Sequence, residues 1–298
     1  MRNKYKMLVL EGGGFFGLID ITFLKFLEDT GVNVCEQINS ISGCSIGGIE
    51  ACALMAGKKP SEIQKAFIDR GSDIFKRRNI NPLSIPWYSD NGLREAITDF
   101  VGDKTLGDTR TIYPKVSMFV PALNMTQNRM KVWDNIDKTD DKRKLVDVAL
   151  DTSAACIYFP VRNYNGDAMT DGGLREVAPV VTHATGVKDK LCVPFEDMDV
   201  FVICAGTSID KHVGTYEEVS KWGVYDWMTK WIISDITQSN RATSKFWGEH
   251  LGFNSFTWFN PISITGDLDD VSQADYILEE CEMYKEMFLS AWERFLAP

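Results

Sequence analysis

The sequence predicts an α/β protein in which helices cover both faces of a mostly parallel sheet. Two observations support this prediction. The run Val200–Cys204 is apolar at every position, which is typical of a strand buried on both faces. The shorter apolar runs Met7–Leu10 and Ile38–Ile41 are each followed by a glycine-rich turn and then by apolar residues at helical spacing. Repeated strand, turn and helix patterns indicate parallel βα units.

Length and composition favour one large domain. The chain has 298 residues, of which 44% are hydrophobic and 25% charged, an ordinary globular composition. It contains no repeat and no linker rich in Pro, Gly or Ser, so we expect a single domain over residues 1–298. Within it, residues 71–112 are poorer in apolar side chains, which indicates an insertion or cap around one short helix near Leu93–Phe100.

Charge and cysteine usage exclude several classes of protein. The 32 Lys and Arg against 42 Asp and Glu give a net charge of −10, which repels nucleic acid and gives no overall attraction to anionic lipid. The seven cysteines lack the spacing of a zinc or redox pair, and no signal peptide or membrane-spanning run is visible. We therefore expect a cytoplasmic protein without nucleic-acid partners, with peripheral membrane contact still open and the oligomeric state unknown.

The first βα unit carries a glycine loop. Gly12, Gly14 and Gly17 fit the pattern G-x-G-x-x-G between the strand Met7–Leu10 and a helix that runs to Leu27. Such a loop binds dinucleotide phosphates in some proteins. However, the second strand and the acid that this use requires are missing, so stabilisation of a developing oxyanion by bare backbone N–H groups is the other interpretation.

The second βα unit carries a candidate nucleophile. Gly43-Cys44-Ser45-Ile46-Gly47 matches G-x-S-x-G at a strand-to-helix junction, where small flanking residues permit the strained turn that exposes a serine. The alternative is a glycine turn with a serine that caps the helix. The helix is expected to continue to Ala56, before Gly57.

A candidate base follows a hairpin in the middle of the chain. The pattern predicts two paired strands, Val116–Leu123 and Met130–Trp133, followed by a helix over Leu145–Cys156. It also predicts a hairpin over Val161–Met169, with its turn at Asn165-Gly166. Directly after the hairpin, Asp171-Gly172-Gly173 can leave a carboxylate facing a loop-lined cleft, although an ordinary Asx turn is equally consistent. No histidine stands in a similar turn, so His183, His212 and His250 are expected to be surface or capping residues.

The C-terminal third is expected to be mainly helical. Residues 216–250 and 272–296 have helical patterns, and an aromatic stripe at Val224, Trp227, Met228, Trp231 and Ile232 is interpreted as core or subunit interface. The acids Asp267, Asp269 and Asp270 lack the glycine and glutamate of a calcium loop. We expect them to interact with the dipole of the following helix and predict no metal site.

The three glycine motifs, in this order, resemble those of the patatin-like phospholipases. Glu11 to Gly17 is similar to the oxyanion loop, Gly43 to Gly47 to the nucleophile turn, and Asp171 to Gly173 to the acid motif. The resemblance implies a three-layer α/β/α fold, a lipid or phospholipid ester substrate and no cofactor. It further implies a Ser45 nucleophile with Asp171 as general base, an oxyanion hole at Gly12, Gly13 and Gly14, and structural glycines at Gly17, Gly43, Gly47, Gly172 and Gly173.

Three positions depart from the family pattern, and two other functions stay open. Phe16 replaces a basic residue, Cys156 a proline, and Val177-Ala178 an Asn-Asn pair, so we expect either a neutral ester substrate or an anionic head group that is held elsewhere. A non-catalytic nucleotide-binding module would use Gly12 to Gly17 as a phosphate cradle. An acyltransferase would use the same serine on a different acceptor.

Overall fold

The computed structural model describes residues 4–78, 86–208, 215–223 and 233–297, and it contains an eight-stranded mixed sheet. The sheet order is β5-β6-β3-β2-β1-β7-β9, with β4 paired to β3. In chain order its strands are Tyr5–Leu10 (β1), Ser40–Gly43 (β2), Ser117–Asn124 (β3), Arg129–Asp134 (β4), Arg162–Tyr164 (β5), Asp167–Asp171 (β6), Met198–Ile203 (β7) and Ser255–Phe259 (β9). A two-stranded sheet pairs Thr207–Ser208 (β8) with Ser263–Ile264 (β10).

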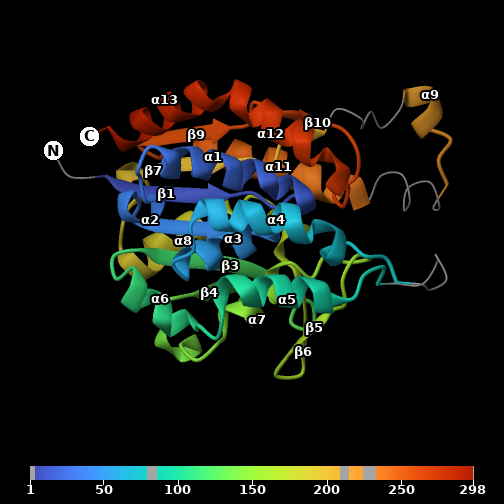
Figure 1. Ribbon diagram of the computed structural model, residues 1–298, viewed down its shortest axis with the longest axis horizontal. Coiled ribbons are helices and arrows are strands. Elements are labelled where there is room, and N and C mark those ends of the chain that lie inside the picture. The colour runs from blue at the N-terminus through green and yellow to red at the C-terminus, as the bar shows by residue number, and fades with distance from the viewer. Residues whose placement is uncertain (1–3, 79–85, 209–214, 224–232, 298) are drawn as a thin grey trace.

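The parallel strands lie together on one side of the sheet. β1 pairs in parallel with β2 and with β7. β2 also pairs in parallel with β3, and β7 with β9. The antiparallel pairs involve β3 to β6. Figure 1 shows these strands crossing the middle of the molecule between helices. The predicted α/β class is thus confirmed.

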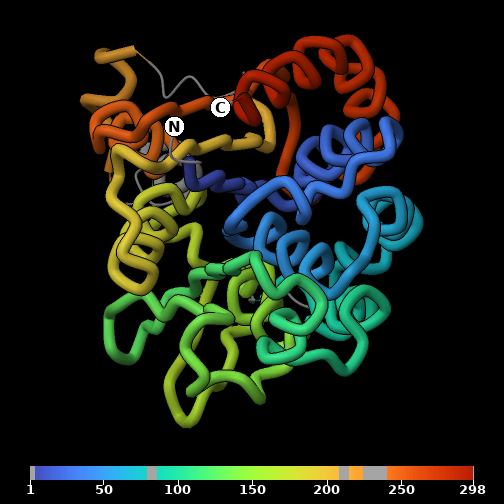
Figure 2. The backbone as a smooth tube through the Cα atoms, turned by 90° about the vertical axis from the view of Figure 1, so that its left-hand side faces the viewer, coloured from blue at the N-terminus to red at the C-terminus, as the bar shows by residue number. Residues whose placement is uncertain are grey.

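Helices cover both faces of the sheet. Their bounds are Leu18–Asp29 (α1), Val34–Gln37 (α2), Ile46–Met55 (α3), Pro60–Ile74 (α4), Asp90–Val101 (α5), Leu106–Ile112 (α6), Leu145–Thr152 (α7), Val180–Leu191 (α8), Tyr216–Val219 (α9), Ile233–His250 (α11), Ala274–Met283 (α12) and Lys285–Leu296 (α13). Figure 2 shows α8 on one side of the sheet and α1 and α4 on the other.

The alternation of side chains along β1 explains the two faces. Leu8 and Leu10 belong to the larger core, which includes apolar residues of α1, α3, α4 and α5, whereas Met7 and Val9 pack with apolar residues of α8. Successive side chains of a strand point to opposite faces. A strand that is apolar at each of these positions therefore needs helices on both sides, as the sequence indicated.

Some elements differ from the sequence-based expectations. Residues 71–112 contain a second helix, α6, which begins with a capping box between Thr105 and Asp108. The strand β9 was not predicted, and the expected last helix is divided at Tyr284 into α12 and α13. The aromatic stripe at 224–232 lies outside the described residues. Within the described part of the chain, no helix combines the length and hydropathy needed to cross a bilayer.

The register of β3 brings two distant turns together. β2 pairs with residues 117–119 of β3, and β6 pairs with residues 122–124. Because β4 occupies the other edge over residues 119–124, β2 and β6 lie along the same edge of β3. β2 runs parallel to β3 and β6 antiparallel, so the carboxyl ends of these two strands approach each other. Ser45 follows one of these ends, and Asp171 is the last residue of the other.

Candidate active site

Ser45 occupies a strained turn between β2 and α3. Its backbone has φ 53° and ψ −122°, a conformation that costs a non-glycine residue about 1–3 kcal/mol. The flanking glycines make room for the turn. A Cβ at Gly47 would lie 2.5 Å from the carbonyl oxygen of Leu10, and one at Gly43 would collide with the carbonyl group of Gly47. The turn therefore holds a half-buried serine at the carboxyl end of a central strand.

Asp171 ends β6 with its side chain buried and hydrogen-bonded. The residue is 5% exposed. Its Oδ1 accepts a hydrogen bond from the Gly173 N–H at 2.7 Å and one from the Cys44 thiol, with an S···O distance of 3.6 Å. A side chain at Gly172 would come within 3.0 Å of the Cys44 sulfur. The glycines after Asp171 thus allow the neighbouring chain to approach the carboxyl group.

The carboxyl group of Asp171 has an unusually high proton affinity. Burial raises its pKa from 3.8 to about 6, and hydrogen bonds from the Ser45 side chain, the Gly173 N–H and the Cys44 thiol oppose the rise. The thiol that donates to Asp171 belongs to Cys44, the residue before Ser45, so the Ser45 turn and the Asp171 carboxyl are neighbours. A carboxylate with this pKa is ionised at neutral pH and is still a stronger base than an exposed one.

The glycine loop passes directly over the serine. A Cβ at Gly12 would lie 3.0 Å from the Cys44 carbonyl oxygen and 3.1 Å from the Cβ of Ser45, so a side chain there would require its neighbours to shift. The Gly12 N–H donates to the Val177 carbonyl oxygen at 2.9 Å and is therefore engaged in this conformation. Among the described residues, the N–H groups of Gly13 and Gly14 have no such acceptor. Of the three glycines expected to form an oxyanion hole, these two keep free donors.

The charged residue at the start of the loop is neutralised by a partner far along the chain. Glu11 is fully buried and accepts hydrogen bonds from the Arg241 Nε at 2.6 Å and from the Ala205 N–H at 3.0 Å. Arg241 belongs to helix α11, and on the same helix the Asn240 side chain donates to the Gly173 carbonyl oxygen at 3.1 Å. Helix α11 therefore contacts both the glycine loop and the loop after Asp171.

Sequence reasoning missed these contacts, because Asn240 and Arg241 stand in no local motif. It also missed Thr152, whose hydroxyl accepts a hydrogen bond from the Ser45 N–H at 3.1 Å. A buried glutamate within a glycine loop requires a cation, and this was the one signal available.

The described histidines lie away from this arrangement. His183 is fully buried, its Nε2 is 2.7 Å from the Ser40 hydroxyl, and burial lowers its pKa to about 3. His250 is exposed and contacts the Phe246 carbonyl oxygen. His212 lies outside the described residues. Within the described residues, no group of three or more His, Cys, Asp or Glu side chains is arranged to hold a metal ion. Asp270, one of the acids before the last helices, accepts a hydrogen bond from the Ser272 N–H instead.

The sequence is similar to proteins named as phospholipases and as patatin-like proteins. Residues 8–182 match a family model described as patatin-like phospholipase. The chain is 32% identical over 213 residues to a protein named cGAMP-activated phospholipase from Pseudomonas aeruginosa, covering 68% of this chain and 62% of that protein. It is 32% identical over 196 residues to an Escherichia coli protein of the same name, covering 58% and 53%. The chain thus spans about half to two thirds of the length of these relatives.

More distant similarities extend over most of the chain. Patatin-like protein 1 from Oryza sativa subsp. indica is 24% identical over 271 residues, covering 76% of this chain and 64% of that protein. Among solved structures, VipD from Legionella pneumophila aligns with a TM-score of 0.40 at 11% identity and covers 98% of this chain and 76% of its own. ExoU from Pseudomonas aeruginosa, in complex with SpcU, aligns with a TM-score of 0.42 at 13% identity, covering 99% and 53%.

Proposed function

Because the chain belongs to the patatin-like phospholipase family, we propose that it hydrolyses carboxylic esters of lipids or phospholipids through a Ser45–Asp171 dyad. The observation that supports this most directly is the meeting of the ends of β2 and β6, where the thiol of Cys44, the neighbour of Ser45, donates to Asp171, a buried carboxyl whose pKa is raised to about 6. A serine nucleophile needs an adjacent base, and this carboxylate has the position and the basicity for that role.

The proposed reaction has two steps. Asp171 accepts the hydroxyl proton as the Oγ of Ser45 attacks the ester carbonyl, and the protonated carboxyl then delivers this proton to the departing alcohol. In the second step, Asp171 takes a proton from a water molecule that attacks the acyl-enzyme. The fatty acid leaves, and the proton returns to Ser45. Both steps pass through an oxyanion, for which the free N–H groups of Gly13 and Gly14 are the proposed donors.

The Glu11–Arg241 pair fits this mechanism. A bare carboxylate at the start of the loop would oppose a negative charge that develops on the substrate. With the Arg241 Nε 2.6 Å from its carboxyl oxygen, the charge of Glu11 is balanced within the protein. The substitution of a basic residue by Phe16 is consistent with a loop whose charges are already compensated.

The proposal is tested by labelling and by product analysis. A fluorophosphonate probe should label the native protein and the Ser42→Ala variant, and it should not label Ser45→Ala. Ser42 is a suitable control because it is a fully buried serine on β2, the strand that leads into the Ser45 turn, and its hydroxyl has no hydrogen-bond partner among the described residues. Labelling of Ser45→Ala at the native rate would disprove the assignment of the nucleophile.

Incubation with phospholipid vesicles then separates hydrolysis from acyl transfer. Free fatty acid is the expected product, whereas an acylated alcohol acceptor would identify an acyltransferase. The assay is run with and without added cGAMP, because two similar proteins are named for activation by that nucleotide. Nucleotide binding without any labelling of Ser45 would favour the non-catalytic alternative.

A further inference from the structure

The end of helix α7 lies between the two proposed catalytic residues. The Thr152 hydroxyl accepts a hydrogen bond from the Ser45 N–H at 3.1 Å and donates one to the Pro121 carbonyl oxygen at 2.6 Å. Two residues further on, the Ala154 carbonyl oxygen accepts the Asp171 N–H at 3.1 Å. One short segment of chain therefore holds the backbone of both residues.

The Thr152 contact has a direct consequence for the strained serine. Ser45 has a positive φ, and the fully buried Thr152 hydroxyl is the partner that the structure gives to its N–H. An unpaired buried N–H costs about 1–3 kcal/mol, so its loss would favour a different backbone conformation. The same bond means that the Ser45 N–H is not free to stabilise the oxyanion.

The packing beside Ser45 is shaped to admit this threonine. A Cβ at Gly48 would lie 2.6 Å from the Thr152 Cγ2 and 3.2 Å from its Oγ1. The pattern G-x-S-x-G does not require a glycine at Gly48. The lack of a side chain there is explained by the space that Thr152 occupies.

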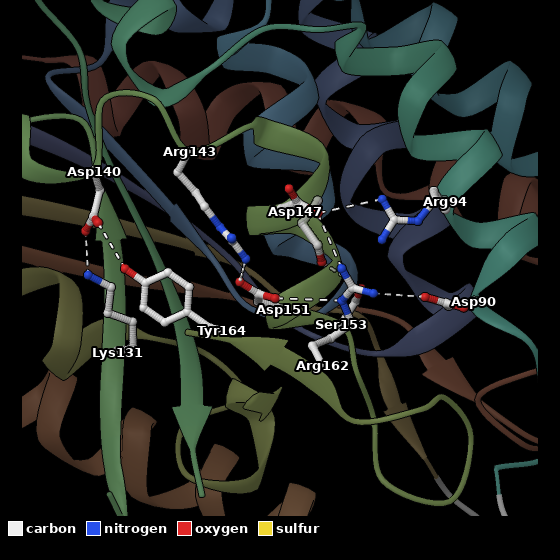
Figure 3. A network of polar contacts seen from close by, with 11 residues as sticks. Asp90, Arg94, Lys131, Asp140, Arg143, Asp147, Asp151, Ser153, Arg162 and Tyr164 are labelled. Atoms are coloured by element: carbon white, nitrogen blue, oxygen red, sulfur yellow. Dashed lines mark hydrogen bonds and ion pairs between the residues drawn. The ribbon is translucent and has the colours of Figure 1, made fainter. Parts of the chain in front are cut away.

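A network of charged side chains holds α7 to its neighbours, as Figure 3 shows. Asp151 accepts a hydrogen bond from Arg143 at 2.6 Å, and the Arg162 Nε lies 3.8 Å from its other oxygen. Arg162 also reaches Asp90 and Asp147 at 3.1 and 3.3 Å. It belongs to β5, which pairs with β6, the strand that ends at Asp171. These ion pairs therefore connect the helix that carries Thr152 to the hairpin that carries Asp171.

From this arrangement we infer that Thr152 is a positioning residue for the reaction, and that its hydroxyl holds the Ser45 backbone so that Oγ stays at the Asp171 carboxylate. The inference rests on the proposed dyad. It assigns to Thr152 no contact with the substrate, so its loss should slow the chemical step and leave binding of the substrate nearly unchanged.

The test compares two threonines with similar bonding. Thr152→Val keeps the shape of the side chain and removes both hydrogen bonds. Thr109→Val is the control: the Thr109 hydroxyl is also fully buried, accepts from the Asn135 side chain at 3.1 Å and donates to the Leu106 carbonyl oxygen at 2.7 Å, on helix α6. Both variants should lose similar stability. For each, kcat and KM on a short-chain ester, the rate of fluorophosphonate labelling and Tm are measured.

We expect Thr152→Val to lower kcat and the labelling rate by about 10- to 100-fold with KM changed less than about twofold, since a small displacement of a reacting group has effects of this size. Thr109→Val should keep the native kcat, and Thr152→Ser, which retains the hydroxyl, should recover most of the rate. If Thr152→Val does not fold, Thr152→Ala takes its place, because it places no methyl group against the Ser45 N–H.

Two outcomes would overturn the inference while the dyad remains in place. One is a native labelling rate in Thr152→Val, or in Thr152→Ala where that variant replaces it. The other is a Thr152→Ser variant as slow as the variant without a hydroxyl. A native protein that the probe does not label at Ser45 would instead refute the proposed function, and the role of Thr152 would fail with it.

Discussion

Replacing Asp171 by Asn should abolish hydrolysis and at the same time stabilise the folded protein above pH 6. Burial raises the pKa of this carboxyl from 3.8 to about 6. The folded state therefore binds the proton more tightly than the unfolded state. The stability that this group contributes is present below about pH 4 and is lost as the pH rises through 6. A pKa difference of about two units corresponds to about 3 kcal/mol.

The asparagine retains much of the hydrogen bonding. Its carbonyl oxygen can accept from the Gly173 N–H and the Cys44 thiol, which Asp171 Oδ1 accepts in the native protein. Urea unfolding at pH 4, 6 and 8 measures the effect. The variant should match the native protein at pH 4 and exceed its free energy of unfolding by about 3 kcal/mol at pH 8. Its hydrolysis should fall as far as that of Ser45→Ala.

Asp151 provides a second test of the same reasoning. Burial raises its pKa to about 6 even though Arg143 and Arg162 lie beside it and lower it. The folded state therefore also binds this proton more tightly than the unfolded state, so Asp151→Asn should gain free energy of unfolding relative to the native protein between pH 4 and pH 8, as Asp171→Asn does. Equal stability of native protein and Asp171→Asn at pH 8, or a difference that does not vary with pH, would refute the reasoning about burial of Asp171.

Three further outcomes are expected. Gly13→Ala should lower kcat by about 10²–10³ with little change in KM, because a Cβ there would lie 2.5 Å from that of Ala205 and displace the loop donors; an unchanged kcat would exclude the loop from the mechanism. His183→Ala should keep most of the native activity, since His183 bonds to Ser40, and a loss equal to that of Ser45→Ala would indicate a triad. Co-sedimentation with vesicles should not depend on anionic lipid, given the net charge of −10; a steep, salt-sensitive rise would identify residues 76–78 as a docking patch.

The sequence predicted those parts of the site that depend on local chain geometry. The strained turn at Ser45 needs glycine on both sides, and the short loop at Asp171 needs glycine after it. Each therefore produces a glycine motif that can be recognised in the sequence. The same patterns did not show how the motifs are joined. The Gly12 N–H donates a hydrogen bond to the Val177 carbonyl oxygen. This contact joins segments more than 160 residues apart in the sequence, so no local pattern predicts it.

Periodicity also failed where polar groups are buried inside helices. Asp20 and Glu50 are fully buried in α1 and α3, and burial raises the pKa of each. Charged residues at such positions are rare without a partner, so the pattern gave no reason to single them out. The strand β9 was missed for a related reason. It is covered by β7, which lies about 50 residues earlier in the chain, and by α13, which comes after it, so its own residues carry little local signal.

Glycine-rich motifs have a physical limit that explains where the remaining support comes from. Glycine permits close approach of the backbone, but it has no side chain with which to anchor a strained turn or neutralise a charge. The anchors for Ser45 and Glu11 must therefore be side chains from other elements, and in this fold they are Thr152 at the end of α7 and Arg241 on α11. The three motifs alone would leave Ser45 without a partner for its N–H and Glu11 with a buried, uncompensated charge. It follows that the structural requirements of the proposed active site extend well beyond the motifs by which the sequence reveals it.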